Sequence, residues 1–183
     1  MVRVRIIAVS GTPGTGKTEF AKKLAERIDA KLIDLNALIE RRNIYELNGE
    51  GTRVVDPEVL GREFLRAIKG IPGPLVVEGL LAHLLPRGRI SHVVVLRTRP
   101  KILEKRLRGR GYSGKKLRDN LEAEALDIIL WEAVHVHGKN RVYEVDTTGL
   151  TSEEAVNLFQ DALEGKISLR PGKIDWLKDF YGS

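Results

Sequence analysis

The residues best suited to chemistry lie in a glycine-rich loop from Gly11 to Thr18, which reads Gly-Thr-Pro-Gly-Thr-Gly-Lys-Thr. This is a complete Walker A pattern, in which backbone N–H groups surround a phosphate and the N-terminus of the next helix adds its positive dipole end. We expect Lys17 to reach the outer phosphates and the Thr18 hydroxyl to ligate Mg²⁺. The loop therefore predicts a nucleoside triphosphate site, whose nucleotide-binding residues are Gly14, Thr15, Gly16, Lys17, Thr18 and Glu19.

The residues on either side of this loop match the strand and the helix that such a site requires. Val4 to Val9 is apolar enough for a buried strand, and Thr18 to Ile28 carries apolar residues at helical spacing. The alternative is a glycine-rich turn that only joins a strand to a helix. The complete pattern in the order strand, loop and helix favours phosphate binding.

Short apolar runs alternate with helical patterns along most of the chain. Such β-branched runs without polar alternation are typical of parallel strands covered on both faces. The further predicted strands are Lys31–Asp34, Leu75–Glu78, His92–Leu96 and Arg141–Val145. The predicted helices are Pro57–Ile68 with Asp56 as its N-cap, Lys101–Arg108, Lys115 to about Val136, and one that begins near Thr151. The sequence therefore predicts one domain, residues 1–183, with a three-layer α/β P-loop fold.

Composition excludes several classes of protein. The 183 residues include no cysteine, which rules out disulfide frameworks and thiolate metal sites. No run approaches the roughly 18 apolar residues of a membrane span, and Met1 leads directly into the first predicted strand without a secretory pattern. We therefore expect a soluble cytoplasmic protein with no membrane partner.

Positive charge is concentrated in one segment. The formal net charge is +6, while Arg97 to Arg118 holds ten lysines and arginines and a single acid, Glu104, for a local charge of +9. This pattern favours binding of several phosphates or of nucleic acid, and a solvated helical face is the alternative. Tyr112 is the only aromatic residue of the segment, which gives base stacking little support.

Two acids end predicted strands and are candidates for a metal site. Glu78 follows three apolar residues, which is the position of a Walker B acid that orders water on Mg²⁺. Asp34 ends the preceding predicted strand and is the weaker candidate. A helix cap or a surface acid is the alternative for Glu78. The predicted metal residues are thus Thr18, directly, and Glu78, through water.

Two segments fit the regular scaffold poorly. Asn43 to Asp56 is polar and long for a simple connection, and Arg108 to Gly114 contains three glycines. Such segments on a rigid scaffold are often substrate covers, although a plain surface loop is the alternative. Together with a phosphate-binding loop, these two segments favour a kinase in which two mobile segments close over the substrates.

Three segments together resemble one family. They are the loop Gly11–Thr18, then Val-Leu-Arg-Thr at Val95–Thr98, then Arg-Leu-Arg-Gly-Arg-Gly-Tyr-Ser-Gly-Lys-Lys-Leu-Arg-Asp-Asn-Leu-Glu-Ala-Glu at Arg106–Glu124. Through these segments the chain resembles the nuclear and archaeal adenylate kinase family, also called adenylate kinase isozyme 6. The resemblance spans nearly the whole chain. The resemblance implies a five-stranded parallel sheet of order 2-3-1-4-5, an NMP-binding segment around Asp34 to Pro57, and a lid around Gly109 to Asp119.

The resemblance also implies an activity and partners. Family members transfer phosphate from ATP to AMP, usually also hydrolyse ATP, and act in maturation of the small ribosomal subunit. ATP and Mg²⁺ are the implied cofactors, AMP the substrate, and a small-subunit ribosomal protein and rRNA the implied partners. Arg110 matches the family's ATP-contacting arginine and joins Lys17 and Glu78 as a catalytic candidate, while Arg106 and Lys116 are nearby candidates for the same work.

Two basic residues outside this segment are candidates for the site that binds the phosphate acceptor. Arg41 and Arg42 are candidates for gripping the AMP phosphate, since arginine suits bidentate contacts with oxyanions, and two surface arginines are the alternative. His83 lies just beyond Glu78 in a loop that we expect to face the phosphates. His135 and His137 are two residues apart, which on a helix points them away from each other.

The chain departs from the family pattern at two places. Leu80 stands where members commonly carry a histidine, so a histidine-dependent ATP hydrolysis would require His83 as a substitute. The helix after the lid carries no arginine and instead offers Glu122, Glu124, Asp127 and Glu132. Two other functions stay open: an ATP-driven assembly switch that binds a ribosomal protein or rRNA with little AMP kinase activity, and a kinase for another small substrate.

Overall fold

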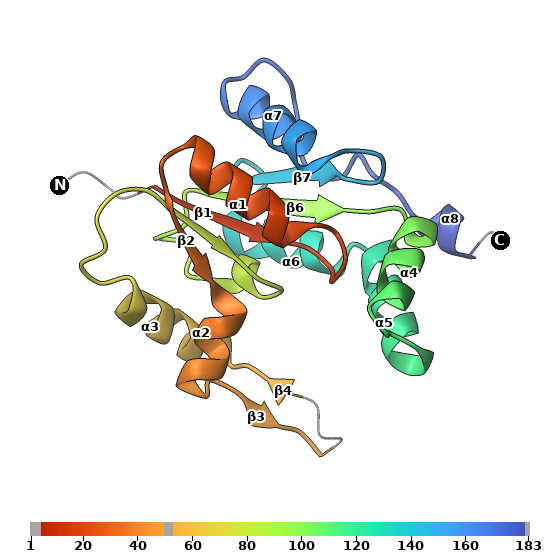
Figure 1. Cartoon of the computed structure of the whole chain (residues 1–183), viewed down its shortest axis with the longest axis horizontal. Coiled ribbons are helices and arrows are strands. Elements are labelled where there is room, and N and C mark those ends of the chain that lie inside the picture. Colours follow the sequence, from red (N-terminus) through yellow and green to blue (C-terminus); the bar gives the residue numbers. More distant parts are fainter. Residues whose placement is uncertain (1–4, 50–52, 182–183) are drawn as a thin grey trace.

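A five-stranded parallel sheet forms the centre of the computed structural model, which describes residues 5–49 and 53–181. Its strands lie in the order β2-β5-β1-β6-β7 (Figure 1), which is 2-3-1-4-5 when the sheet strands alone are counted, so the predicted order is confirmed. The strands are β1 (Ile6–Ser10), β2 (Lys31–Asp34), β5 (Leu75–Glu78), β6 (His92–Arg97) and β7 (Val142–Asp146). Val4, the predicted start of β1, lies outside the described residues.

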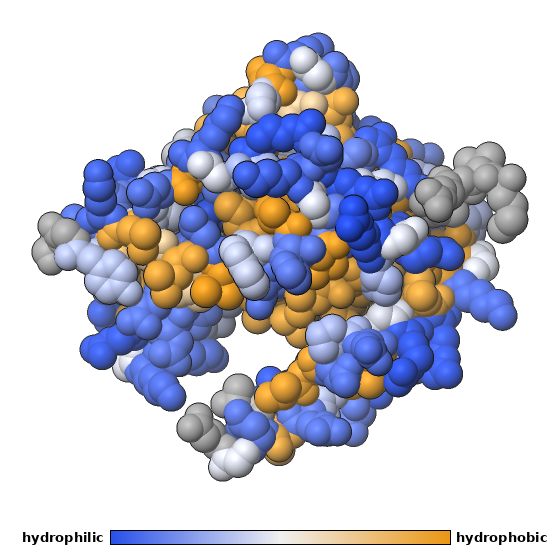
Figure 2. Space-filling view, turned by 180° about the vertical axis from the view of Figure 1, so that it is seen from behind, coloured by the Kyte–Doolittle hydropathy of each residue, from blue (hydrophilic) through white to orange (hydrophobic). Residues whose placement is uncertain are grey.

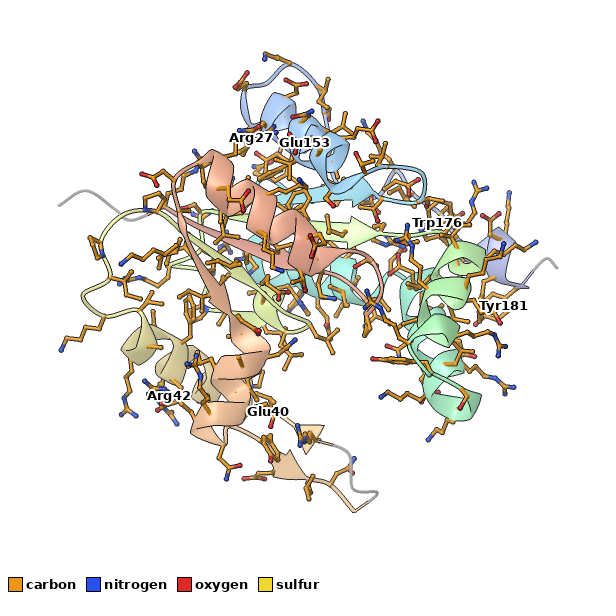
Figure 3. The ribbon with its side chains drawn as sticks, in the orientation of Figure 1. Arg27, Glu40, Arg42, Glu153, Trp176 and Tyr181 are labelled. Atoms are coloured by element: carbon orange, nitrogen blue, oxygen red, sulfur yellow. The ribbon has the colours of Figure 1, made fainter. Side chains whose placement is uncertain are left out.

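Helices cover both faces of the sheet and complete three layers (Figure 1). One face packs on α1 (Lys17–Arg27) and α7 (Ser152–Leu163) through Phe20 and Phe159, both buried. These two helices are also joined by an ion pair between Arg27 and Glu153 (Figure 3). The other face packs on α2 (Leu35–Arg42), α3 (Pro57–Ala67) and α6 (Ile128–His137).

The predicted start of α3 is observed. The Asp56 carboxylate accepts hydrogen bonds from the N–H groups of Glu58 and Val59, and Pro57 occupies the first turn, where no N–H is needed. Within residues 5–49 and 53–181, no helix is long and apolar enough to cross a membrane.

Two parts of the chain project from the sheet. The first is a hairpin after α2, made of β3 (Glu46–Leu47) and β4 (Arg53–Val54); residues 50–52 of the predicted acceptor segment lie outside the described chain. The second is the pair α4 (Pro100–Gly109) and α5 (Gly114–Ala125), against which the C-terminal α8 (Leu177–Tyr181) packs. Figure 2 shows the surface notched between these two parts, with apolar residues above the notch.

The single helix predicted from Lys115 to about Val136 is wrong. The chain forms two helices instead, α5 and α6, because Asp127 adopts a left-handed conformation with φ of 56° between them. This break brings the Asp127 carboxylate and the Glu124 carbonyl oxygen to the same guanidinium nitrogen of Arg97. Satisfying a buried charge thus overrides the local helical pattern.

The α7 side of the core offers a test of stability. Phe159 is fully buried, and its ring lies 5.2 Å from that of Tyr143 and 6.1 Å from that of Phe20. We expect Phe159→Ala to lower the free energy of unfolding by about 3–5 kcal/mol, measured by urea denaturation, because it leaves a cavity. Leu47→Ala, at a side chain that is 65% exposed, should change it by less than about 0.5 kcal/mol. Equal losses in the two variants would contradict this packing.

Candidate active site

The glycine loop lies at the carboxyl edge of the sheet, directly after β1. Gly11 has φ of 147°, and a Cβ there would lie 2.6 Å from the Leu96 carbonyl oxygen, so only glycine fits this approach to β6. Within the loop, the Thr15 hydroxyl donates to the Thr12 carbonyl oxygen at 2.9 Å. Lys17 Nζ donates to the same oxygen at 3.1 Å. The loop is therefore held in shape by its own side chains.

Lys17 is a half-buried cation in this loop. Burial lowers the pKa of its ammonium to about 8; the charge of Glu78 opposes this shift and that of Arg110 adds to it. A buried ammonium with few anionic neighbours gains most from a phosphate, because the ligand supplies the missing negative charge. The electrostatics of Lys17 thus suit the binding of an anion.

Thr18 and Glu78 offer oxygen ligands side by side. The Thr18 hydroxyl donates to Glu78 Oε1 at 3.3 Å, and Glu78 is buried at the end of β5. Burial raises the pKa of Glu78, and Asp34, opposite it in the register of β2 and β5, raises it further. A hydroxyl and a carboxylate are the hard ligands that Mg²⁺ prefers. In the described part of the chain no cluster of three or more metal-ligating His, Cys, Asp or Glu side chains occurs, so phosphate oxygens would complete the coordination.

Asp34 itself caps the next helix. Its Oδ1 accepts a hydrogen bond from the Ala37 N–H at 2.9 Å, which starts α2. Its carboxylate is therefore committed to the helix terminus while it adds negative charge beside Glu78.

Two cavities meet at the loop. The first, of about 390 Å³, has the loop residues Gly14 to Gly16 on one side and the apolar side chains of Phe20, Leu96 and Leu150 on the other. The second, of about 400 Å³, contains the predicted phosphate and metal residues Lys17, Thr18 and Glu78. Glu19 and Arg110 line both cavities. Arg110 follows α4 and is exposed, so its guanidinium lies between the two spaces with room to move.

Arg106 and Lys116 have different surroundings. Arg106 lines the first cavity and donates to the Gly14 carbonyl oxygen at 3.2 Å and the Thr147 carbonyl oxygen at 3.4 Å, which ties α4 to the loop and to the end of β7. Lys116 is exposed, with its ammonium 4.3 Å from the ring centroid of Tyr112. Tyr112 in turn lines the second cavity.

The predicted acceptor arginines lie on the outer surface of α2. Arg42 Nη1 donates to Glu63 Oε2 on α3 at 2.7 Å, and Figure 3 shows Arg42 on the side of α2 nearest α3. Arg41 is exposed, and its Nε donates to the Ala37 carbonyl oxygen at 3.2 Å. The residue that α2 contributes to the second cavity is Asn36. Sequence reasoning missed Asn36, although its place two residues after a strand-ending acid was a usable signal.

His83 does not face the phosphates, and the expectation that it does is wrong. It is 1% exposed, with Nδ1 2.9 Å from Ser10 Oγ and Nε2 2.8 Å from Glu132 Oε2. Burial holds its pKa below the ordinary value, against the opposing effect of Glu132. Leu80 does line the second cavity. The short 3₁₀ helix η1 (Ala82–Leu84) turns the His83 side chain inward beneath the loop.

Two further histidines, His135 and His137, also make structural contacts. His135 stacks on Trp131, with ring centroids 5.3 Å apart, while His137 is buried with its Nε2 2.9 Å from the His83 carbonyl oxygen. They share no partner in these contacts, as their spacing predicts.

Arg97 is not part of an external basic surface, so that part of the prediction for Arg97 to Arg118 is wrong. Its guanidinium is 1% exposed and forms ion pairs with Glu124, Asp127 and Glu144. Burial lowers the pKa of Arg97, but the three carboxylates outweigh burial and hold the pKa above its ordinary value. Two of the acids that follow the lid, Glu124 and Asp127, thus pair with a buried arginine. The exposed cations of the segment include Lys101, Lys105, Arg108, Lys115, Lys116 and Arg118.

Solved structures with the same fold are kinases of small metabolites. A shikimate kinase from Bacteroides thetaiotaomicron aligns with a TM-score of 0.60 and 22% identity, over 88% of this chain and 98% of that one. A gluconokinase from Sinorhizobium meliloti aligns with a TM-score of 0.54 and 18% identity, over 91% and 99% of the two chains. At these identities the likeness establishes the P-loop kinase fold alone.

Sequence relatives are closer. Residues 7–127 match a family model described as an AAA domain. A Pyrococcus furiosus protein named "Putative adenylate kinase" is 41% identical over 94% of this chain and 92% of its own length. A Methanocaldococcus jannaschii protein of the same name is 34% identical over 96% and 94% of the two chains. Because this identity extends over nearly all of both proteins, the chain belongs to the family of these archaeal proteins, each named "Putative adenylate kinase".

Proposed function

We propose that this chain is an adenylate kinase that transfers the γ-phosphoryl group of ATP to AMP and yields two molecules of ADP. The observation that carries the proposal is that Arg110 lines two adjoining cavities, one of which holds Lys17, Thr18 and Glu78. A phosphoryl transfer site needs cations placed to neutralise the charge on the transferred group. The names of the relatives in Pyrococcus and Methanocaldococcus support the same activity.

We assign the first cavity to the nucleoside of ATP and the second to the reacting phosphates. The apolar wall of the first cavity, with Phe20 and Leu96, suits a base and ribose, and the loop residues shared by both cavities suit the triphosphate. Residues 34–57 would bind AMP and residues 109–119 would form the lid of a single domain. Within residues 34–57, the candidates for contacting AMP are Asn36 and the predicted Arg41 and Arg42. Arg42 is paired with Glu63 in this structure and would have to leave this partner to contact AMP.

The reaction is an in-line displacement. An oxygen of the AMP phosphate forms a bond to the γ-phosphorus, while the bond from that phosphorus to the β–γ bridging oxygen breaks and its electron pair stays on the ADP that leaves. Lys17 and Arg110 would neutralise the charge on the transferred group. Thr18 and Glu78 would hold Mg²⁺, Glu78 through water, and when bound this ion shields the phosphate charges. Catalysis would thus rely on the alignment of ATP with AMP and on neutralising the charge of the transferred phosphoryl group.

The lining of the second cavity favours transfer to AMP over hydrolysis. Leu80 occupies the position of the family's histidine and provides no group to orient water, while His83 lies buried beneath the loop. The second candidate function is an ATP-driven switch in assembly of the small ribosomal subunit, binding a ribosomal protein or rRNA. The exposed cations of α4 and α5 favour this candidate, because such a surface attracts the phosphates of RNA.

The first test measures ADP production from ATP with each nucleoside monophosphate and from ATP alone. We expect a rate that depends on AMP and is lost in Lys17→Ala, since Lys17 is the cation of the glycine loop that lines the second cavity. If AMP gives no increase over ATP alone, the phosphotransferase proposal fails and the assembly switch takes its place.

The second test concerns the lid arginine. We expect Arg110→Ala to lower kcat by about 100-fold, since it removes a cation from both cavities. Arg108→Ala is the matched control, because Arg108 is an exposed cation two residues from Arg110 that is paired with Glu104 on its own helix. A similar loss in both variants would show that general lid charge, and not the position of Arg110, supports transfer.

The third test is the pH dependence of ATP binding. Because the pKa of Lys17 lies at about 8, its charged form is present below that pH and is lost above it. A bound phosphate favours the charged form, so the Kd for ATP should rise by up to about tenfold per pH unit above pH 8. Isothermal titration calorimetry between pH 7 and 9.5 measures this slope. Lys17→Met should bind weakly at every pH and lack the slope, and a wild-type Kd that stays constant would refute the role of Lys17.

A further inference from the structure

A buried hydrogen bond joins the far end of the lid helix to the phosphate-binding loop. Glu124, in the last turn of α5, is 2% exposed, and its Oε2 accepts a hydrogen bond from the Thr12 hydroxyl at 2.6 Å. Its other oxygen, Oε1, accepts from Arg97 Nε and from the Thr98 N–H, both at 2.9 Å. Both oxygens of this carboxylate are therefore used, one on the loop and one on the end of β6.

The Thr12 side chain is turned away from the phosphate space. Thr12 is 2% exposed and is not among the residues that line the two cavities. Its carbonyl oxygen accepts from Lys17 Nζ at 3.1 Å, while its hydroxyl is given to Glu124. Thr12 thus contacts Lys17 through its main chain and the lid helix α5 through its side chain.

The other side of Glu124 is anchored in the sheet. Arg97, at the end of β6, also binds Glu144 on β7, with 2.7 Å between Arg97 Nη1 and Glu144 Oε1. Glu144 Oε2 accepts the N–H groups of Gly172 and Lys173 at 2.9 and 3.1 Å, which fixes the C-terminal segment to the same cluster. Glu124 is therefore anchored to the sheet, and the Thr12 hydroxyl links this carboxylate to the loop.

The geometry points to Glu124 as a positioning residue that sets where the lid closes over the loop. Helix α5 begins at Gly114, so it extends about 15 Å from Glu124 toward the segment that carries Arg110. With the Glu124 end fixed to Thr12, the other end moves along a defined path, and Arg110 returns to one place above the phosphates. This inference rests on the proposed phosphoryl transfer and adds to it the residue pair that aligns the lid.

Thr12→Val tests the pair, and Thr12→Ser is its matched control. Valine keeps the shape and removes the donor, whereas serine keeps the hydroxyl. We expect Thr12→Val to lower kcat about tenfold, the usual effect of losing a hydrogen bond to a buried carboxylate. The Kd for ATP should stay within about twofold, because the hydroxyl touches no cavity, and Thr12→Ser should keep most of kcat. Unchanged kcat in Thr12→Val, or equal losses in kcat and ATP affinity, would overturn the proposal, the second by showing a distorted loop.

A distance measurement tests the pair without any catalysis. The natural chain contains no cysteine, so Lys22→Cys on α1 and Lys115→Cys at the start of α5 attach two spin labels at defined sites. With a non-hydrolysable ATP analogue, pulsed electron resonance should give one narrow distance distribution in the labelled parent and in Thr12→Ser, and a broad one in Thr12→Val. Equal widths in the two Thr12 variants would refute the positioning role. A failure of AMP-dependent ADP formation would instead refute the proposed function and leave this distance result to stand alone.

Discussion

The buried guanidinium of Arg97 is the interaction on which the active edge of this protein depends. Three carboxylates converge on it, from the end of α5, from the start of α6 and from β7. A charge in this position is costly unless it is paired and fully hydrogen-bonded, and removing one partner of such a group leaves the others uncompensated. The positions of the lid helices and of the C-terminal segment are therefore coupled to one residue at the end of a central strand.

This cluster also explains the electrostatics of the site. Three carboxylates around one arginine leave an excess of negative charge beneath the loop, and burial raises the pKa of Glu144 while Arg97 opposes the shift. Glu124 and Glu78 both support the charge of Lys17 against burial. Glu124, which follows the lid in the sequence, thus acts from behind the loop and stabilises the charge of Lys17.

The sequence was most informative where chemistry is local. The loop Gly11–Thr18 needs a strand before it and a helix after it, and both follow from the residues on either side, so the loop's place in the fold was predictable. The parallel sheet was predictable as well, because its strands are apolar on both faces, as β1 shows with all five residues buried. The Asp56 cap of α3 likewise depends only on neighbouring residues. The order of the strands came from the family resemblance carried by residues such as Arg106–Glu124.

What the sequence determined by itself is therefore the phosphate-binding loop, the α/β class and the family. The tertiary structure alone decided the environment of each charge, because charges far apart in sequence meet only after folding. Arg97 looked like one more cation of a basic segment until its partners, up to 47 residues away, surrounded it. From the sequence, His83 was expected to face the phosphates, whereas in the fold η1 directs its ring toward Ser10 and Glu132. Thr12 and Glu124 are 112 residues apart, and no pattern in the chain announces the bond between the loop and the lid.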